Sequence, residues 1–191
     1  LEISKVEVLR RQEMSRDLEL VRERNRELGL ISKYDELTGL LNLRGFTEQI
    51  KNFCSKSEHQ RAYIIYADLD HLKEINDTWG HPAGNFALRS VANIFNGCLR
   101  SQDVVARTGG DEFLILLNCQ EKNFQDIFRK RVRDACAAFN AESGKPFLVE
   151  VSLGITEFKP SPETDIPAII EHADKDLYEA KKLRKNSVRR P

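Results

Sequence analysis

Residues 104–117 read VVARTGGDEFLILL, in which two apolar runs flank a pair of glycines and a pair of acids. Apolar runs separated by a short glycine-containing stretch predict a β-hairpin, because glycine supplies the backbone conformations that the tip requires. Asp111 and Glu112 are therefore expected side by side at the start of a buried strand. Two neighbouring carboxylates repel each other, so we expect positive charge beside this hairpin.

The segments on either side of the hairpin predict a mixed α/β domain. The stretch 61–70, RAYIIYADLD, is apolar on both faces, as a central strand should be. Residues 124–139 and 161–182 predict helices, and residues 147–156 predict a strand. Another helix is expected from Pro82 onward, since apolar residues recur at helical spacing at Ala87, Val91, Ile94, Phe95 and Cys98. The predicted order is helix, strand, helix, hairpin, helix, strand and helix, layered on one sheet.

Composition excludes several classes of function. The 191 residues include 30 basic and 30 acidic side chains, which leaves no overall field to attract nucleic acid or a membrane surface. No apolar run approaches the roughly 20 residues of a membrane-spanning helix, and no signal-peptide pattern opens the sequence. Cys54, Cys98, Cys119 and Cys136 form no C-x-x-C pair, so buried free thiols in a reducing cytoplasm are expected.

The first 33 residues are highly charged and have a helical periodicity of their own. Met14, Val21 and Leu28 recur every seven residues at d positions of a heptad repeat, and Asn25 lies at an a position. This pattern predicts a short parallel coiled coil in which the Asn fixes the register. A single solvated helix is the alternative that so short a repeat leaves open. Because the chain begins with Leu1 rather than Met, we expect it to be a piece of a longer protein.

Carboxylates also follow the predicted central strand. Asp68 and Asp70 lie at its carboxyl end, whereas Asp111 and Glu112 lie at the hairpin tip. If the two segments are neighbours in the sheet, these acids converge at one edge, where Mg²⁺ or Mn²⁺ would be the natural counter-charge. The alternative, equally compatible with such short motifs, is that they are turn and cap residues that are solvated separately.

Three lysines are placed to hold phosphate. Lys73 lies in HLKEIND, a stretch that can start a short helix whose backbone N–H groups face the ligand of the acids. Lys181 and Lys185 are four residues apart, so they share one face of the last predicted helix. Acids and lysines together indicate a metal and phosphate site.

Five sequence blocks occur in the order found in GGDEF-domain proteins, the diguanylate cyclases: DELTGLLNLRGF, DLDHLKEINDTWGH, RTGGDEF, VSLGIT and ADKDLYEAKK. The chain resembles this family over residues 34–188, which leaves 189–191 as a tail. The resemblance implies a nucleotidyl-cyclase-like α/β fold, in which helices flank a central, mostly antiparallel sheet and a signalling helix precedes it. It also implies that two GTP molecules condense into cyclic di-GMP and two pyrophosphates in a homodimer, with one GTP bound by each protomer.

The resemblance assigns roles to individual residues. Asp68, Asp111 and Glu112 would hold Mg²⁺ or Mn²⁺ together with the backbone carbonyl of Leu69, and the acidic pair would help to activate the 3′-hydroxyl. The positions that match the triphosphate contacts of the family are His71, Leu72, Lys73, Gly109, Gly110, Lys181 and Lys185. Lys185 stands where the family usually has Arg, so the charge is kept but the bidentate fork is lost.

Guanine recognition is where the sequence departs from the family. Asn76 matches the base-binding Asn, whereas the family motif GHxxGD reads GHPAGN here and ends at Asn85. A carboxylate accepts from two guanine donors, while an amide offers one carbonyl oxygen and an opposing NH₂ group. One such bond typically contributes ~0.5–1.5 kcal/mol, so we expect weaker GTP binding or looser purine choice with the metal chemistry kept.

Arg100 and Asp103 form an R-x-x-D motif, RSQD, shortly before the hairpin. In the family this motif is the inhibitory site at which a cyclic di-GMP dimer binds, and Arg131 matches the residue that completes it from a second domain. In an arbitrary protein the same residues would be a surface ion pair. Three functions are therefore compatible with the sequence: an active diguanylate cyclase, a catalytically weak module that binds GTP or cyclic di-GMP, and a cyclase with relaxed purine selectivity.

Overall fold

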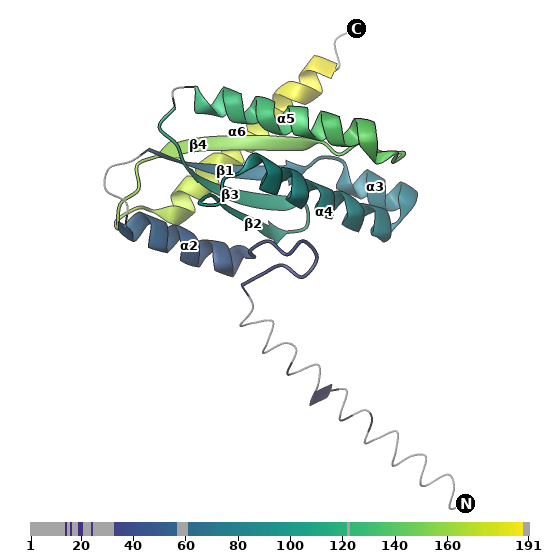
Figure 1. The fold of residues 1–191 in the computed structure, drawn as a ribbon, viewed down its shortest axis with the longest axis horizontal. Coiled ribbons are helices and arrows are strands. Elements are labelled where there is room, and N and C mark those ends of the chain that lie inside the picture. The colour runs from purple at the N-terminus through teal and green to yellow at the C-terminus, as the bar shows by residue number, and fades with distance from the viewer. Residues whose placement is uncertain are drawn as a thin grey trace, which may run out of the picture. The chain divides into compact units, whose positions relative to one another are not determined.

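The computed structural model describes residues 33–56, 61–121 and 123–188, together with residues 14, 16, 19, 20 and 24, and describes side chains as far as residue 182. In this part of the chain one sheet has the strand order β2-β3-β1-β4. Its strands are β1 (Ala62–Leu69), β2 (Val104–Gly109), β3 (Glu112–Asn118) and β4 (Val151–Phe158). Every pairing is antiparallel, and β1 lies in the middle as its apolar sequence predicts. The predicted antiparallel sheet and its hairpin are confirmed (Figure 1).

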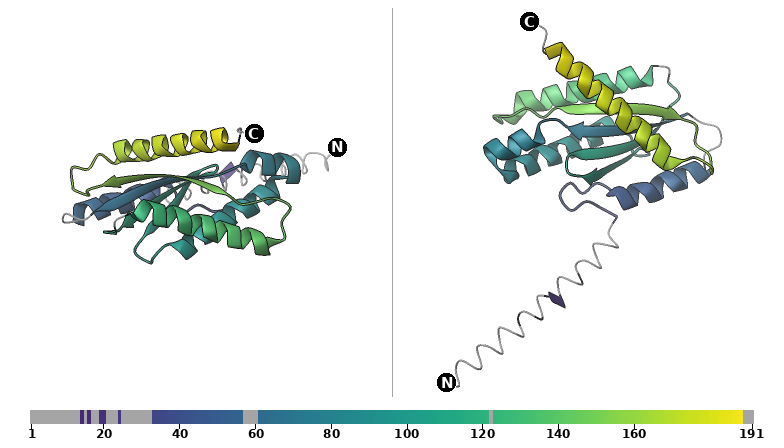
Figure 2. Two further views of the ribbon diagram at one scale, coloured as in Figure 1. Left: turned by 90° about the horizontal axis from the view of Figure 1, so that it is seen from above. Right: turned by 180° about the vertical axis from the view of Figure 1, so that it is seen from behind.

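Helices cover both faces of the sheet (Figure 2). They are α2 (Leu43–Lys56), α3 (Leu72–Trp79), α4 (His81–Cys98), α5 (Phe124–Ser143) and α6 (Ile166–Val188). α4 and α5 contribute to one hydrophobic core, and α2 and α6 contribute to a second core on the opposite face. The helix predicted from Pro82 onward is confirmed, since the five apolar side chains of its predicted stripe are all buried.

β1 separates the two cores because its side chains alternate between the faces of the sheet. Ile65 and Ala67 pack in the core of α4 and α5, whereas Ile64 packs in the core of α2 and α6. Tyr66, two residues after Ile64, packs against that second core as well. By the same alternation Asp68 lies on the face that α6 covers.

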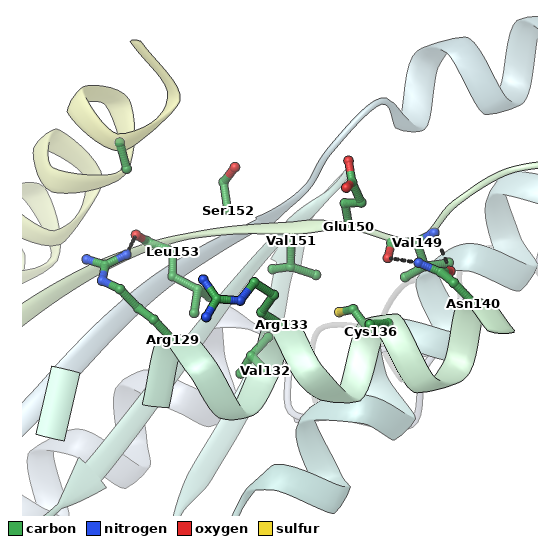
Figure 3. A pocket seen from close by; sticks show the side chains of 12 residues that line it. Arg129, Val132, Arg133, Cys136, Asn140, Val149, Glu150, Val151, Ser152 and Leu153 are labelled. Carbon is green, nitrogen blue, oxygen red and sulfur yellow. Dashed lines mark hydrogen bonds between the residues drawn. The ribbon is translucent and has the colours of Figure 1, made fainter. Parts of the chain in front are cut away.

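The strand predicted over residues 147–156 begins later than expected, at Val151. The backbone of Val149 pairs with the side chain of Asn140 on α5 instead of with a strand. Its N–H donates to Asn140 Oδ1 over 2.8 Å, and its carbonyl oxygen accepts from Asn140 Nδ2 over 2.9 Å (Figure 3). The strand begins where Val151 meets Leu69, the last residue of β1.

The chain divides into two units, Leu1–Ser32 and Lys33–Pro191, and only the second is described in detail. The coiled coil or single helix predicted for residues 1–33 falls almost wholly outside the described residues. Within the described part, no helix combines the length and the apolar character that crossing a membrane requires.

Candidate active site

Three side chains form a row across the sheet where β1 ends. Asp68 lies opposite Glu112 of β3 on one side and opposite Ser152 of β4 on the other. The backbone N–H of Leu69 donates to the carbonyl oxygen of Asp111 over 3.0 Å, which joins the hairpin tip to the end of β1. The two acidic segments are therefore neighbours in the sheet, which is the condition under which the acids converge at one edge.

Lys181 provides positive charge beside these acids, with its Nζ 2.6 Å from Asp68 Oδ1. Close packing of α6 on β4 places it there. A Cβ atom on Gly154 would lie 2.4 Å from the backbone nitrogen of Leu177, so the helix backbone rests directly on the strand. Gly154 pairs with Tyr66 in the sheet. Lys181 lies one helical turn beyond Leu177, and Asp68 lies two residues beyond Tyr66 on the same face of the sheet. Because Leu177 packs on Gly154 beside Tyr66, Lys181 and Asp68 are brought together one step further along the helix and the strand.

Negative charge at this edge exceeds what Lys181 neutralises. Burial raises the pKa of Asp68; Lys181 opposes that effect, and the neighbouring carboxylates of Asp111 and Asp70 reinforce it. Burial also raises the pKa of Tyr66, and the nearby acids contribute to that shift. Among the described side chains, this edge therefore carries more negative than positive charge.

The donor chemistry of the acidic row fits a hard divalent cation. In the described part of the chain, no three carboxylate, histidine or cysteine side chains come together as a metal cage. Mg²⁺ seldom uses such a cage, because it usually binds one or two carboxylates together with substrate phosphates. The oxygen donors of Asp68, Asp111 and Glu112, and the negative charge that Lys181 leaves unbalanced, match that mode of binding.

Asp68→Asn is expected to stabilise the ligand-free domain at neutral pH. Because folding raises the pKa of Asp68, the ionised carboxylate disfavours the folded state. Wild-type stability is therefore fullest below the unfolded pKa and falls as the pH rises through the folded pKa, whereas an amide has no such dependence. Urea unfolding at pH 7 and pH 3 measures this difference. The exposed Asp77→Asn is the control, and a variant less stable than wild type at pH 7 would contradict the expectation.

The turn from β1 into α3 gathers the residues predicted to contact the triphosphate. The hydroxyl of Ser152 donates to the carboxylate of Asp70, with Oγ 2.8 and 2.9 Å from its two oxygens. His71 then adopts a left-handed backbone (φ 62°), and Leu72 begins α3. The first-turn N–H groups of a helix have no helical acceptor, so they are suited to an anion. Lys73 is exposed on the same turn.

α3 and α4 carry the two predicted base readers. Asn76 is partly buried on α3, and Asn85 is exposed near the start of α4. Gly80 alone joins the helices and donates its N–H to the carbonyl oxygen of Asn76 over 2.8 Å. Gly84 precedes Asn85 and lies against the side chain of Asn76. Asn76 and Asn85 therefore lie at the same helix junction.

The hairpin tip is held by Arg107, a residue that sequence reasoning missed. Its Nη1 donates to both carboxylate oxygens of Asp35 over 3.1 Å, and its Nε and Nη2 donate to the carbonyl oxygen of Gly110 over 3.0 and 2.7 Å. Asp35 also accepts from the N–H and hydroxyl of Thr38, over 2.9 and 2.6 Å. An acid three residues before a Thr is a turn signal, but it does not reveal the distant arginine.

Gly109 and Gly110 are exposed, and a Cβ atom on either would meet nothing within 4 Å. The tip is therefore open on the side where a ligand would approach. Lys185 belongs to α6, but its side chain lies outside the described residues.

A second pocket brings Arg100, Asp103 and Arg131 together on one chain. The backbone N–H of Arg100 donates to Asp103 Oδ2 over 2.8 Å, and Arg131 Nη1 donates to the carbonyl oxygen of Cys98 over 3.1 Å. Burial raises the pKa of Asp103, against the lowering effect of the two arginines. The resemblance implies that Arg131 acts from a second domain, yet this chain's own Arg131 already lines the pocket.

A cavity of about 440 Å³ between α5 and β4 holds none of the predicted site residues (Figure 3). Arg129 donates to the carbonyl oxygen of Leu153 at its wall, and Arg133 and Cys136 face it from α5. The predicted site residues, namely the acids, Lys181 and the hairpin glycines, therefore lie outside this cavity.

The family model and the similar proteins described below agree on one family. A model described as "Diguanylate cyclase, GGDEF domain" matches residues 32–187. "Diguanylate cyclase A" of Treponema denticola is 36% identical over 135 residues, which are 70% of this chain and 36% of that protein. "Cyclic di-GMP phosphodiesterase PdeR" of Escherichia coli is 31% identical over 172 residues, which are 86% of this chain and 25% of that protein.

A solved structure is also similar. The diguanylate cyclase SiaD of Pseudomonas aeruginosa, determined with its activator SiaC, superposes with a TM-score of 0.70 at 29% identity. The match covers 95% of this chain and 72% of that one. This chain spans about a third or less of the curated relatives named above, 36% and 25% of their lengths. On sequence and fold together, the chain belongs to the GGDEF-domain family of diguanylate cyclases.

Proposed function

We propose that this chain is the output domain of a diguanylate cyclase. Two GTP molecules condense: each 3′-oxygen bonds to the α-phosphorus of the other GTP, each 3′-hydroxyl loses its proton, and two pyrophosphates leave. The observation that carries the proposal is the edge at which Asp68 contacts Lys181 and lies opposite Glu112 of the GGDEF hairpin.

Each group at this edge has a task in the proposed reaction. A divalent cation held by Asp68, Asp111, Glu112 and the Leu69 carbonyl would neutralise the triphosphate and activate the 3′-hydroxyl. Lys181, whose Nζ contacts Asp68, would pair with the terminal phosphates of the bound nucleotide. Lys73, the backbone at His71 and Leu72, and Lys185 surround the same triphosphate.

Two copies of the domain are needed, because each holds one GTP and one set of acids. We place the domain at residues 34–188, with 1–33 as a coiled-coil linker from an upstream sensor and 189–191 as a tail. The linker would set how the two GTP-loaded domains face each other.

The setting that fits this chain is the cytoplasm. Its four cysteines are buried free thiols, which favours a reducing compartment. Equal numbers of acidic and basic residues give no reason to expect a nucleic acid or membrane surface as partner.

Asn85 supports a second candidate, a cyclase with relaxed purine selectivity. It is exposed at the junction that also holds Asn76, and its amide offers one carbonyl oxygen and an opposing NH₂ group where a carboxylate offers two oxygens. A third candidate, a module that binds GTP or cyclic di-GMP with little turnover, is favoured by the similarity to a relative named as a phosphodiesterase.

One incubation experiment separates the three candidates. The chain is supplied with Mg²⁺ and GTP, ATP or both, and the products are resolved by chromatography and mass. The proposed function requires cyclic di-GMP from GTP alone. Mixed or adenine-containing cyclic dinucleotides would identify the relaxed cyclase. If no mixture yields a cyclic dinucleotide, both enzymatic candidates are wrong.

Arg100→Ala is expected to weaken inhibition by added cyclic di-GMP by about tenfold or more, because a charge-assisted contact contributes ~1.5–3 kcal/mol. Arginine suits this pocket since its planar fork binds phosphate and stacks on a base. The measurement is the concentration of cyclic di-GMP that halves the initial rate with GTP. The exposed Arg44→Ala on α2 is the control, and equal inhibition of both variants would remove the R-x-x-D pocket from the proposal.

A further inference from the structure

We propose that Gly84 is a positioning residue for base recognition, because its lack of a side chain leaves room for the side chain of Asn76 in the position from which that side chain would contact the base. This inference rests on the proposed function, in which Asn76 contacts guanine. Gly84 is buried in the first turn of α4, directly before Asn85. Its backbone has no left-handed torsion, so the conformation of the chain does not require a glycine there. A glycine is required there because a side chain would not fit beside Asn76.

A side chain at position 84 would collide with the base reader. An ideal Cβ atom there lies 2.1 Å from Asn76 Oδ1 and 2.8 Å from its Cγ, with Leu72 Cδ1 at 3.1 Å. Contacts below 3.0 Å are essentially absent between Cβ atoms and their neighbours. The two closest atoms belong to the amide of Asn76 and not to backbone, so an alanine would displace that amide rather than separate the helices.

Other features of the junction limit how the side chain of Asn76 can move away from an alanine at position 84. Its carbonyl oxygen accepts from Gly80, the single residue between α3 and α4, so the backbone of Asn76 is tied to the start of α4. Its side chain is partly buried and lies on a helix, where one of the three χ1 rotamers is rare, so fewer alternative positions are open to it. An amide that has rotated away from position 84 no longer presents the same donor and acceptor to a base.

Gly84→Ala is therefore expected to lower affinity for a guanine nucleotide about three- to tenfold, the value of one hydrogen bond. Binding of an adenine nucleotide, which shares the triphosphate, should stay within about twofold, since the contacts of the phosphates are untouched. Alanine is a better helix former than glycine, so the variant should fold. Gly97→Ala is the matched control: Gly97 lies on the same helix, and a Cβ atom there meets nothing within 4 Å.

The experiment measures calorimetric binding of 3′-deoxy-GTP and 3′-deoxy-ATP to the full chain with Mg²⁺. Neither nucleotide has the 3′-hydroxyl that condenses, so binding is seen without turnover. In an Asn76→Ala background, Gly84→Ala should change the affinity for 3′-deoxy-GTP no further, because the side chain that it displaces is gone. If the two substitutions instead lower the affinity for 3′-deoxy-GTP independently, so that their effects multiply in the double variant, the inference is wrong. It is also wrong if Gly84→Ala binds 3′-deoxy-GTP as tightly as the wild-type chain does.

A second measurement separates this inference from the proposed function. The side-chain NH₂ resonances of Asn76, assigned by their loss in Asn76→Ala, should shift in Gly84→Ala and stay in place in Gly97→Ala. Unmoved resonances overturn the positioning role whatever the protein binds. A wild-type chain that binds neither nucleotide overturns the proposed function, and the base-reading part of the inference with it.

Discussion

Asp111→Asn is expected to lower the rate of cyclic di-GMP formation about a thousandfold or more while the fold is retained. The substitution removes one charged oxygen donor, and a bound cation contributes several kcal/mol of transition-state stabilisation that depends on such donors. The fold does not need the side chain, because the contact with Leu69 uses the backbone carbonyl of Asp111. Initial rates with Mg²⁺ and GTP give the effect, and circular dichroism with thermal unfolding checks the fold.

Glu142→Gln is the matched control for Asp111→Asn. It also replaces a carboxylate by an amide, at an exposed position on α5. Its rate should equal that of wild type. If Asp111→Asn retains wild-type activity, the acidic edge is not the site of the reaction, and the proposed function loses the observation on which it depends.

Arg107→Met is expected to lower the free energy of unfolding by about 3 kcal/mol, because removing one partner of a partly buried, multiply hydrogen-bonded ion pair leaves the other charge unpaired. The side chains of Arg107 and Asp35 are only 14% and 22% exposed. The carbonyl oxygen of Gly110 loses its donors in the same step. Urea denaturation gives the value, and a loss below about 1 kcal/mol would contradict this account.

Arg61→Met is the control for this substitution, since Arg61 and Glu157 form an ion pair with 39% and 47% exposed side chains. An exposed pair contributes at most about 1 kcal/mol.

Although burial alone would raise the pKa of Asp35, hydrogen bonds from Thr38 and Arg107 lower it overall. The stability that this pair supplies is therefore present above the unfolded pKa and is lost as the pH falls through the folded pKa.

Local patterns were sufficient to predict most of the fold. The hairpin follows from two apolar runs around glycines, and β1 follows from its continuous apolar sequence, since only a central strand buries both faces. The helix from Pro82 follows from the spacing of its apolar residues. The late start of β4 could not be predicted, because it depends on a side chain of α5, Asn140, that competes for the backbone of Val149.

The acids of the candidate site could be predicted, but the contacts that arrange them could not. Asp68 and Asp111 can be recognised in the sequence because each is an acid that adjoins the end of an apolar run predicted to be a strand. Arg107 and Asp35 are 72 residues apart, so nothing in the local sequence of either indicates the other. The same holds for Gly84, which reads as an ordinary helix glycine until the side chain of Asn76 is placed beside it.

Among the described side chains, Lys181 is the cation that pairs with Asp68, so a bound triphosphate would compete with Asp68 for its charge. A lysine drawn to a triphosphate leaves Asp68 beside Asp111 without a counter-charge, while a lysine that stays on Asp68 opposes the entry of a second cation. If the site binds a divalent cation and a nucleotide as proposed, each would relieve the obstacle that the other meets, which is positive coupling in the thermodynamic sense. In the proposed function the site would therefore bind its metal and its nucleotide together more readily than either one alone.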